Sequence, residues 1–235
     1  MKILIIGGSG GIGAALVQLF LTSHPEAIIY STYRSNKPDI DNSRIHWFKV
    51  DLSSEQEIRS LAERIPELTL LVNAVGILHQ PDNQPEKSIK EFNGDFFNHN
   101  MTSNVMPTIY LAKHFAVHLK SKKNSHFVTI SARIGSIEDN KIGGWISYRC
   151  SKAALNMALK TISVEWKYKL PNCCVFAFHP GTTDTNLSKQ FQRNVPANKL
   201  FTPEYVAHCL AELISKKTAT DSGQFFSYDG SKIPW

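Results

Sequence analysis

Short apolar runs alternate along the chain with longer segments in which apolar residues recur every three or four positions. The runs predict strands, and they cover residues 2–6, 27–32, 44–50, 68–72, 125–131, 173–178 and 223–228. The recurring segments predict helices over residues 14–23, 55–65, 97–120, 146–169 and 202–215. This regular alternation predicts an α/β fold in which one doubly wound parallel sheet carries helices on both faces.

Polar and proline-containing segments mark the expected interruptions. Residues 79–98 contain two prolines and few apolar positions, which favours a loop with a short helix, and residues 132–145 are expected to form a loop. Pro107 is expected to interrupt or tighten the long helix that contains it. Ser53 is expected to cap the helix that follows it, and Thr202 to begin the last helix.

The chain of 235 residues suits one domain, and no linker or repeat divides it, so we expect a single domain over residues 1–235. No apolar run reaches about 18 residues, so no membrane span is expected. The first apolar run leads into glycines rather than a cleavage site, which favours a strand over a signal peptide. The four cysteines lack metal-site and disulfide spacing, so no metal and a reduced, cytoplasmic setting are expected.

The formal net charge of +6 raises the question of a nucleic-acid partner. Lysines and arginines are scattered, and the densest cluster, residues 120–123, is typical of a helix end or loop. A basic surface suited to small anionic ligands is therefore favoured over a nucleic-acid partner.

A glycine-rich turn separates the first strand from the first helix. Backbone N–H groups in such a turn, together with the helix N-terminus, bind a pyrophosphate. The pattern predicts the phosphate-binding turn of a Rossmann-type dinucleotide domain, and a structural turn without a ligand is the alternative. The candidate cofactor-binding residues here are Gly7, Ser9, Gly10, Gly11, Ile12 and Gly13.

Three later strand ends add cofactor candidates. Arg34 follows the second strand, where no acidic residue stands to hold ribose hydroxyls, so NADP(H) is favoured over NAD(H). An exposed Arg with no ligand is the alternative. Asp51 and Leu52 are expected beside the adenine, and Asn73, Ala74 and Gly76 at the ligand-binding end of the fourth strand.

Tyr148 and Lys152 lie four residues apart in a segment of good helix formers, so they share a helix face. A nearby ammonium favours the phenolate and lowers a tyrosine pKa, which suits a general acid and base. The same spacing also arises by chance on solvated helices.

Taken in order, these pieces resemble the short-chain dehydrogenase/reductase family over essentially the whole chain. The segments around Tyr148, residues 179–185 and residues 228–235 are most similar to its C-factor and sniffer-like carbonyl reductase branch. The resemblance implies that Tyr148 exchanges a proton with the carbonyl oxygen, and that Lys152 binds the nicotinamide ribose and lowers the Tyr148 pKa. It implies a water relay supported by Asn104.

The resemblance also implies a second group of cofactor contacts, to the carboxamide and phosphates, from Pro180, Gly181, Thr183 and Thr185. In one respect the chain departs from the family, because Ala132 occupies the position of the catalytic serine. Ser131 and Ser136 flank it, and both are candidates for the missing hydroxyl, although strand alternation points Ser131 to the opposite face.

Two functions remain open at this point. The first is an NADP(H)-dependent oxidoreductase that reduces a small carbonyl compound or oxidises the alcohol. The second is a cofactor-binding regulatory or signalling protein with vestigial catalysis, which the missing serine would suit. In either case we expect a homodimer or homotetramer, and a partly apolar substrate lid over residues 186–200.

Overall fold

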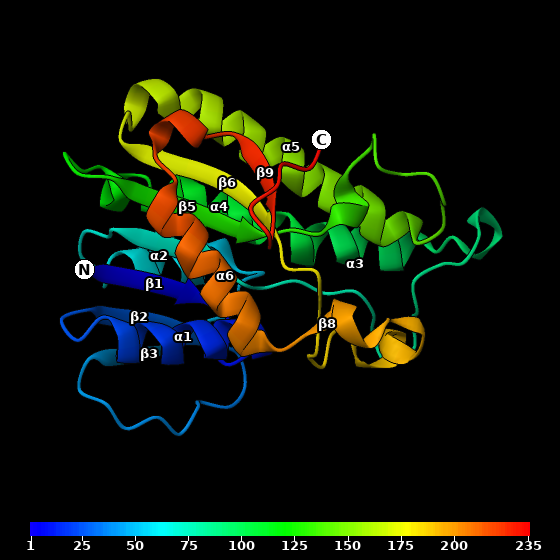
Figure 1. Ribbon diagram of the computed structural model, residues 1–235, viewed down its shortest axis with the longest axis horizontal. Helices are drawn as coiled ribbons and strands as arrows, with labels where there is room; N and C mark the ends of the chain where they lie inside the picture. The colour runs from blue at the N-terminus through cyan, green and yellow to red at the C-terminus, as the bar shows by residue number, and fades with distance from the viewer.

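Seven strands form one parallel sheet in the computed structural model, which describes residues 1–235 (Figure 1). The order across the sheet is β3-β2-β1-β4-β5-β6-β9. The strands are β1 (Lys2–Ile6), β2 (Ile28–Tyr33), β3 (Ile45–Lys49), β4 (Leu70–Asn73), β5 (Ser125–Ile130), β6 (Cys173–His179) and β9 (Gln224–Ser227). The order reverses direction between β1 and β4, and in open α/β sheets such a reversal marks the ligand-binding edge.

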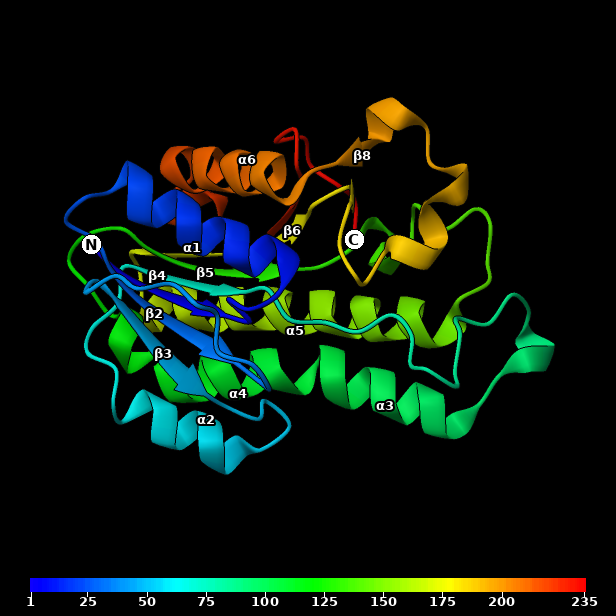
Figure 2. The ribbon, with the colours of Figure 1, turned by 90° about the horizontal axis from the view of Figure 1, so that it is seen from below.

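Helices cover both faces of the sheet, as the alternation predicted (Figure 2). On one face lie α1 (Gly11–Ser23) and α6 (Pro203–Lys216). On the other lie α2 (Glu55–Ala62), α3 (Gly94–Asn104), α4 (Met106–Phe115) and α5 (Ile146–Lys169). Successive strand residues feed two separate cores, because side chains alternate across a strand: Leu4 and Ile6 belong to one core, Ile3 and Ile5 to the other.

The expected lid connects two short strands. β7 (Thr182–Thr183) pairs in parallel with β8 (Leu200–Phe201), separately from the main sheet. The intervening chain contains the 3-10 helices Lys189–Asn194 and Ala197–Lys199. In Figure 2 this segment extends past the carboxyl ends of the main strands, beside the start of α5.

Several local expectations need correction. The helix expected from residue 97 begins at Gly94. The interruption expected near Pro107 is confirmed, since α3 and α4 meet at Val105 and Pro107 has no N–H to continue the hydrogen-bond ladder. The cap of α2 is Ser54 rather than Ser53, since the Ser54 hydroxyl accepts from the N–H of Glu57. The α2 helix also ends at Ala62, three residues before the expected end.

The loop expected over residues 132–145 contains a short 3-10 helix, Arg133–Gly135. Another, Ile89–Glu91, precedes α3 in the polar stretch. No helix of the structure has the length and apolarity needed to cross a bilayer.

Candidate active site

Tyr148 and Lys152 lie side by side on the buried face of α5, where they are 6% and 3% exposed. The Lys152 ammonium nitrogen is 5.7 Å from the centre of the Tyr148 ring and donates to the carbonyl of Ile130 at 3.3 Å. The 3-10 helix after β5 packs tightly on this turn, because a Cβ at Gly135 would lie 2.7 Å from the Lys152 Cβ. The chain therefore fixes the pair at the carboxyl end of β5.

Burial dominates the electrostatics of this pair. It raises the pKa of Tyr148 above its ordinary value near 10, and it lowers the pKa of Lys152 to about 8. The expectation that Lys152 lowers the pKa of Tyr148 is therefore wrong for the protein alone. Burial causes the rise, because an ionised phenol oxygen would lose its hydration at this site. The phenol is protonated at neutral pH.

The first turn of α5 is held by a carboxylate that the sequence analysis did not identify. Glu86, only 2% exposed, accepts from the N–H of Ser147 at 3.3 Å and also from the Ser147 hydroxyl. Its backbone carbonyl accepts from the N–H of Trp145. A negative group at a helix N-terminus is stabilised by the unpaired N–H groups there. Glu86 is 61 residues from Ser147, so no local pattern indicated the pairing.

Asn104 connects three parts of the site. Its side-chain oxygen accepts from the N–H of Ile77 at 2.7 Å, and its nitrogen donates to the Ile77 carbonyl at 3.1 Å and to the Ser151 hydroxyl at 2.9 Å. Gly76 lies against the pair, since a Cβ there would be 3.1 Å from the Lys152 nitrogen. The amide thus ties α3 to α5 and to the turn after β4. The expected water relay stays a prediction.

Neither candidate serine is hydrogen-bonded to Tyr148. Ser131 donates to the side chain of Asn156 at 2.6 Å, on the face of the sheet that α5 covers. The Ser136 hydroxyl accepts from the N–H of Asp139 at 3.1 Å and donates to the Trp235 carbonyl at 3.4 Å. Their catalytic role stays a prediction, and each hydroxyl already has a structural partner.

His179 is the last residue of β6 and lies near Ala132, the residue at the position of the catalytic serine. The sequence analysis did not identify His179. Its Nδ1 accepts from the N–H of Arg133 at 3.2 Å, which leaves Nε2 to carry the proton. Burial first, and then the charge of Arg133, lower the pKa of His179 to about 4. A neutral imidazole therefore stands beside the loop that begins at Ala132.

The glycine turn has the geometry of a phosphate cradle. Gly7 has a φ of +82°, and a Cβ at Gly13 would lie 2.1 Å from the Gly7 carbonyl oxygen, so both positions require glycine. The α1 helix has no side-chain cap, and the N–H groups of Gly11, Ile12 and Gly13 have no acceptor. Ser9 and Gly10 complete the turn at the surface. These unpaired donors fit the pyrophosphate of a dinucleotide.

The other predicted cofactor residues meet the glycine turn from two sides. A Cβ at Gly11 would lie 2.6 Å from the Thr185 side chain, which brings the loop after β6 against the start of α1. In that loop Gly181 has a φ of +72°, and the Thr183 hydroxyl donates to the Pro180 carbonyl at 3.5 Å.

On the other side Arg34 is exposed at the end of β2. Hydrogen bonds from Ser53, and the charge of Arg34, lower the pKa of Asp51, so these two side chains stand at the same edge. Leu52, partly buried, packs against the core beside them.

Asn73 has a structural role in this arrangement. It is fully buried, and its side chain accepts from the N–H of Val75 at 3.1 Å and donates to the Thr108 hydroxyl at 2.9 Å. The N–H of Ala74 donates to the carbonyl of Ile6. Asn73 therefore shapes the turn after β4, and its contact with the cofactor stays a prediction.

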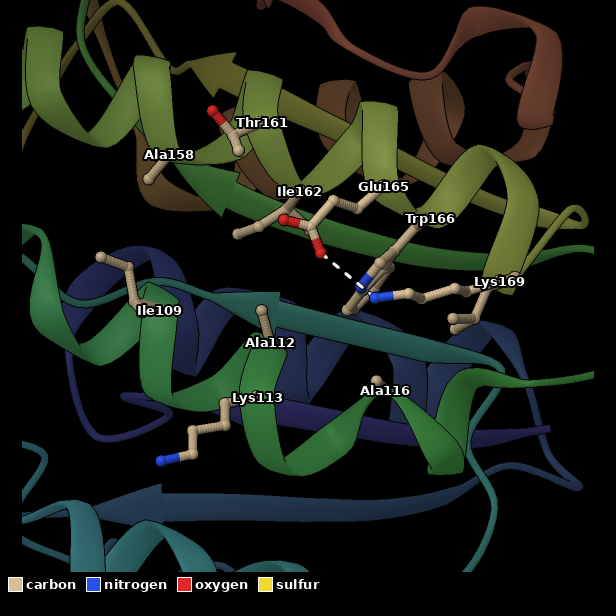
Figure 3. Close-up of a pocket in the computed structure, with 11 residues that line it drawn as sticks. Ile109, Ala112, Lys113, Ala116, Ala158, Thr161, Ile162, Glu165, Trp166 and Lys169 are labelled. Atoms are coloured by element: carbon tan, nitrogen blue, oxygen red, sulfur yellow. Dashed lines mark hydrogen bonds and ion pairs between the residues drawn. The ribbon is translucent and has the colours of Figure 1, made fainter.

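A separate groove of about 440 Å³ lies between α4 and α5, on the outside of the molecule (Figure 3). None of the candidate site residues lines it. Its lining side chains are Ile109, Ala112, Lys113, Ala116, Ala158, Thr161, Ile162, Glu165, Trp166, Lys169 and Leu170.

Comparison with known proteins gives one family. The family model described as short chain dehydrogenase matches residues 1–196. An uncharacterized oxidoreductase of Saccharomyces cerevisiae is 31% identical, over 97% of this chain and 95% of its own.

Solved structures have the same fold. The carbonyl reductase Sniffer of D. melanogaster matches with a TM-score of 0.86 at 24% identity, over 100% of this chain and 99% of its own. An NADPH-bound carbonyl reductase from chicken fatty liver matches with a TM-score of 0.86 at 23% identity, over 100% of this chain and 94% of its own. The family model and the yeast relative show that the chain belongs to the short-chain dehydrogenase/reductase family of oxidoreductases.

Proposed function

We propose that this protein uses NADP(H) to interconvert a small carbonyl compound and its alcohol, with Tyr148 as the group that exchanges the proton. The observation that carries the proposal is the buried Tyr148 and Lys152 pair at the carboxyl edge of the sheet. The cradle of unpaired N–H groups in the glycine turn lies at the same edge. When bound, the cofactor supplies or accepts the hydride.

In the reducing direction Tyr148 donates its phenol proton to the carbonyl oxygen. Its raised pKa keeps it protonated at neutral pH, as an acid must be. The Lys152 ammonium stands close enough to stabilise the phenolate that remains. In the oxidising direction Tyr148 accepts the proton of the alcohol once it is deprotonated, and the neighbouring Lys152 ammonium favours that deprotonated form.

Two observations support NADP(H) over NAD(H). Arg34 is exposed at the end of β2, and no acidic residue follows that strand to bind the ribose hydroxyls. A guanidinium placed there suits a 2′-phosphate. The chicken carbonyl reductase of the same fold was solved with NADPH bound.

The α4–α5 groove supports the expected homodimer or homotetramer. Most of the side chains that line it are apolar, and Ile109 among them is 39% exposed. Apolar exposure of this kind is typical of surfaces that contact another chain.

The four cysteines are unpaired, which suits the expected reducing, cytoplasmic setting.

The proposal is tested by following NADPH oxidation against a panel of aldehydes, ketones and diketones, with the protein and with Tyr148→Phe. We expect turnover with part of the panel and a loss of order 10²-fold or more in the variant, the scale of a general acid. NADPH binding is expected to be nearly unchanged in Tyr148→Phe. Equal rates in the two proteins would overturn the role of Tyr148, and no oxidation with any carbonyl would overturn the activity.

The alternative of a regulatory protein with vestigial catalysis is not favoured, because the similar proteins are oxidoreductases.

A further inference from the structure

Three rings from separate parts of the chain meet beside Tyr148. Trp145 precedes α5, Phe191 belongs to the 3-10 helix of the lid, and His79 follows β4. The Phe191 ring centre is 5.0 Å from that of Trp145 and 5.8 Å from that of His79. The Trp145 ring centre is 6.4 Å from that of Tyr148. We call Trp145, Phe191 and His79 the aromatic cluster.

The cluster is not part of the folding core. None of its members belongs to either buried cluster that flanks the sheet, and each is partly exposed. Rings that gather next to a reacting group without joining the core are available to a ligand.

Trp145 is held in a conformation that its own backbone disfavours. Its φ of +53° is the only positive value outside glycine in the chain. Such a residue costs of order 1 kcal/mol or more and persists where the surroundings fix it. Here the N–H of Trp145 donates to the carbonyl of Glu86, and the helix begins at the next residue. The backbone of Trp145 is therefore fixed three residues before Tyr148.

Phe191 lies in the lid, and hydrogen bonds near β7 hold this part of the lid in place. The Ser188 hydroxyl donates to the carbonyl of Thr183, and the Gln192 amide donates to the side chain of Asp184 at 2.9 Å. The Phe191 N–H donates to the Ser188 carbonyl at 2.7 Å. The lid thus places the Phe191 ring against the Trp145 and His79 rings, and the paired strands β7 and β8 hold its two ends together.

We propose that the aromatic cluster selects carbonyl compounds in which a flat aromatic group is attached next to the carbonyl. This inference rests on the proposed carbonyl reduction. An aryl group gains edge-to-face or offset contacts with these rings that an alkyl group of equal size does not. The position of Trp145 beside Tyr148 places that group next to the carbonyl that receives the phenol proton.

The test compares kcat/KM for phenylglyoxal and cyclohexylglyoxal, two substrates that differ in a flat ring against a saturated ring of similar size. The ratio of the two values is measured in the protein and in Phe191→Leu and Trp145→Leu. One aromatic pair contributes roughly 2- to 12-fold, so we expect the aryl preference to fall by that factor in each variant. Trp145→Phe keeps a ring and is expected to retain most of the preference.

Tyr168→Leu is the matched control, because it removes a ring that is 82% exposed near the other end of α5. Its ratio is expected to equal that of the unmodified protein. Turnover in both ring variants with an unchanged ratio would overturn this inference and leave the proposed function standing. Absence of NADPH oxidation with every carbonyl of the panel would overturn both. If Trp145→Leu does not fold, Phe191→Leu decides the question alone.

Discussion

Ser147 gives both its backbone N–H and its hydroxyl to the buried carboxylate of Glu86. The pairing closes the N-terminus of α5 one residue before Tyr148, and it uses a side chain from the polar stretch after β4. The position of the proposed proton donor therefore depends on a residue that has no chemical role of its own.

Glu86→Gln tests this dependence. The amide keeps the shape but loses the negative charge, and it brings a donor toward a hydroxyl and an N–H that both need acceptors. Hydrogen bonds to charged groups contribute about 1.5 to 3 kcal/mol each, so we expect a loss of free energy of unfolding on that scale, measured in urea. We also expect kcat to fall more than KM changes.

Glu138→Gln is the control for Glu86→Gln, since Glu138 is exposed and its carboxyl group makes no hydrogen bond or ion pair. It should leave both the free energy of unfolding and kcat as they are. Equal behaviour of the two variants would show that the Glu86 contact does not position α5.

Lys152→Met separates function from stability. The pKa of Lys152 is lowered to about 8 from 10.5, so between these values the unfolded chain binds more protons than the folded one. The free energy of unfolding contributed by this group therefore rises as pH increases from 8 to 10.5, by about 3 kcal/mol, and is lowest below pH 8.

The Met variant lacks this titration. We expect it to be more stable than the unmodified protein at pH 7, by an amount that shrinks toward pH 10.5, and to lose carbonyl reduction. Denaturation in urea at a series of pH values measures the difference. Parallel stability curves for the two proteins would contradict the prediction.

Ala132→Ser addresses the missing hydroxyl. If Ala132 faces the substrate oxygen, one donor is absent where negative charge develops, and removal of such a donor elsewhere costs about 10² to 10³ in rate. We expect Ala132→Ser to raise kcat for carbonyl reduction by up to about 10²-fold. Ser136→Ala is the comparison, because the Ser136 hydroxyl is engaged with Asp139 and Trp235. A severe loss in Ser136→Ala with no gain in Ala132→Ser would place the hydroxyl at Ser136 instead.

Arg34→Gln tests cofactor choice. A charge-assisted contact to the 2′-phosphate contributes about 1.5 to 3 kcal/mol, or roughly 10- to 150-fold in affinity. We expect the Kd for NADPH to rise by that factor while the Kd for NADH stays the same, as measured by quenching of intrinsic fluorescence. Lys37→Gln, a neighbouring exposed cation, is the control. Equal affinity of the unmodified protein for NADH and NADPH would contradict the preference.

The sequence predicted the sheet and the position of the glycine turn because both depend on local patterns. Apolar runs give strands, Gly7 occurs where the turn needs a positive φ, and Gly13 occurs where the helix passes close to the Gly7 carbonyl. The features that the sequence did not predict are contacts between residues far apart in the chain. Glu86 reaches Ser147 across 61 residues, and the aromatic cluster gathers three segments. The Tyr148 pKa was predicted in the wrong direction because residue spacing reports a nearby charge but does not report burial.

The Asn104 side chain pairs with Ile77 as a neighbouring strand would, because it accepts from the N–H and donates to the C=O of the same residue. Ile77 lies beyond the end of β4 and has no strand beside it there. Its amide proton is thus sheltered by one side chain rather than by the sheet. The rate of amide hydrogen exchange at Ile77 consequently reports how often α3 separates from the turn. It measures local opening of the site in the absence of substrate and cofactor.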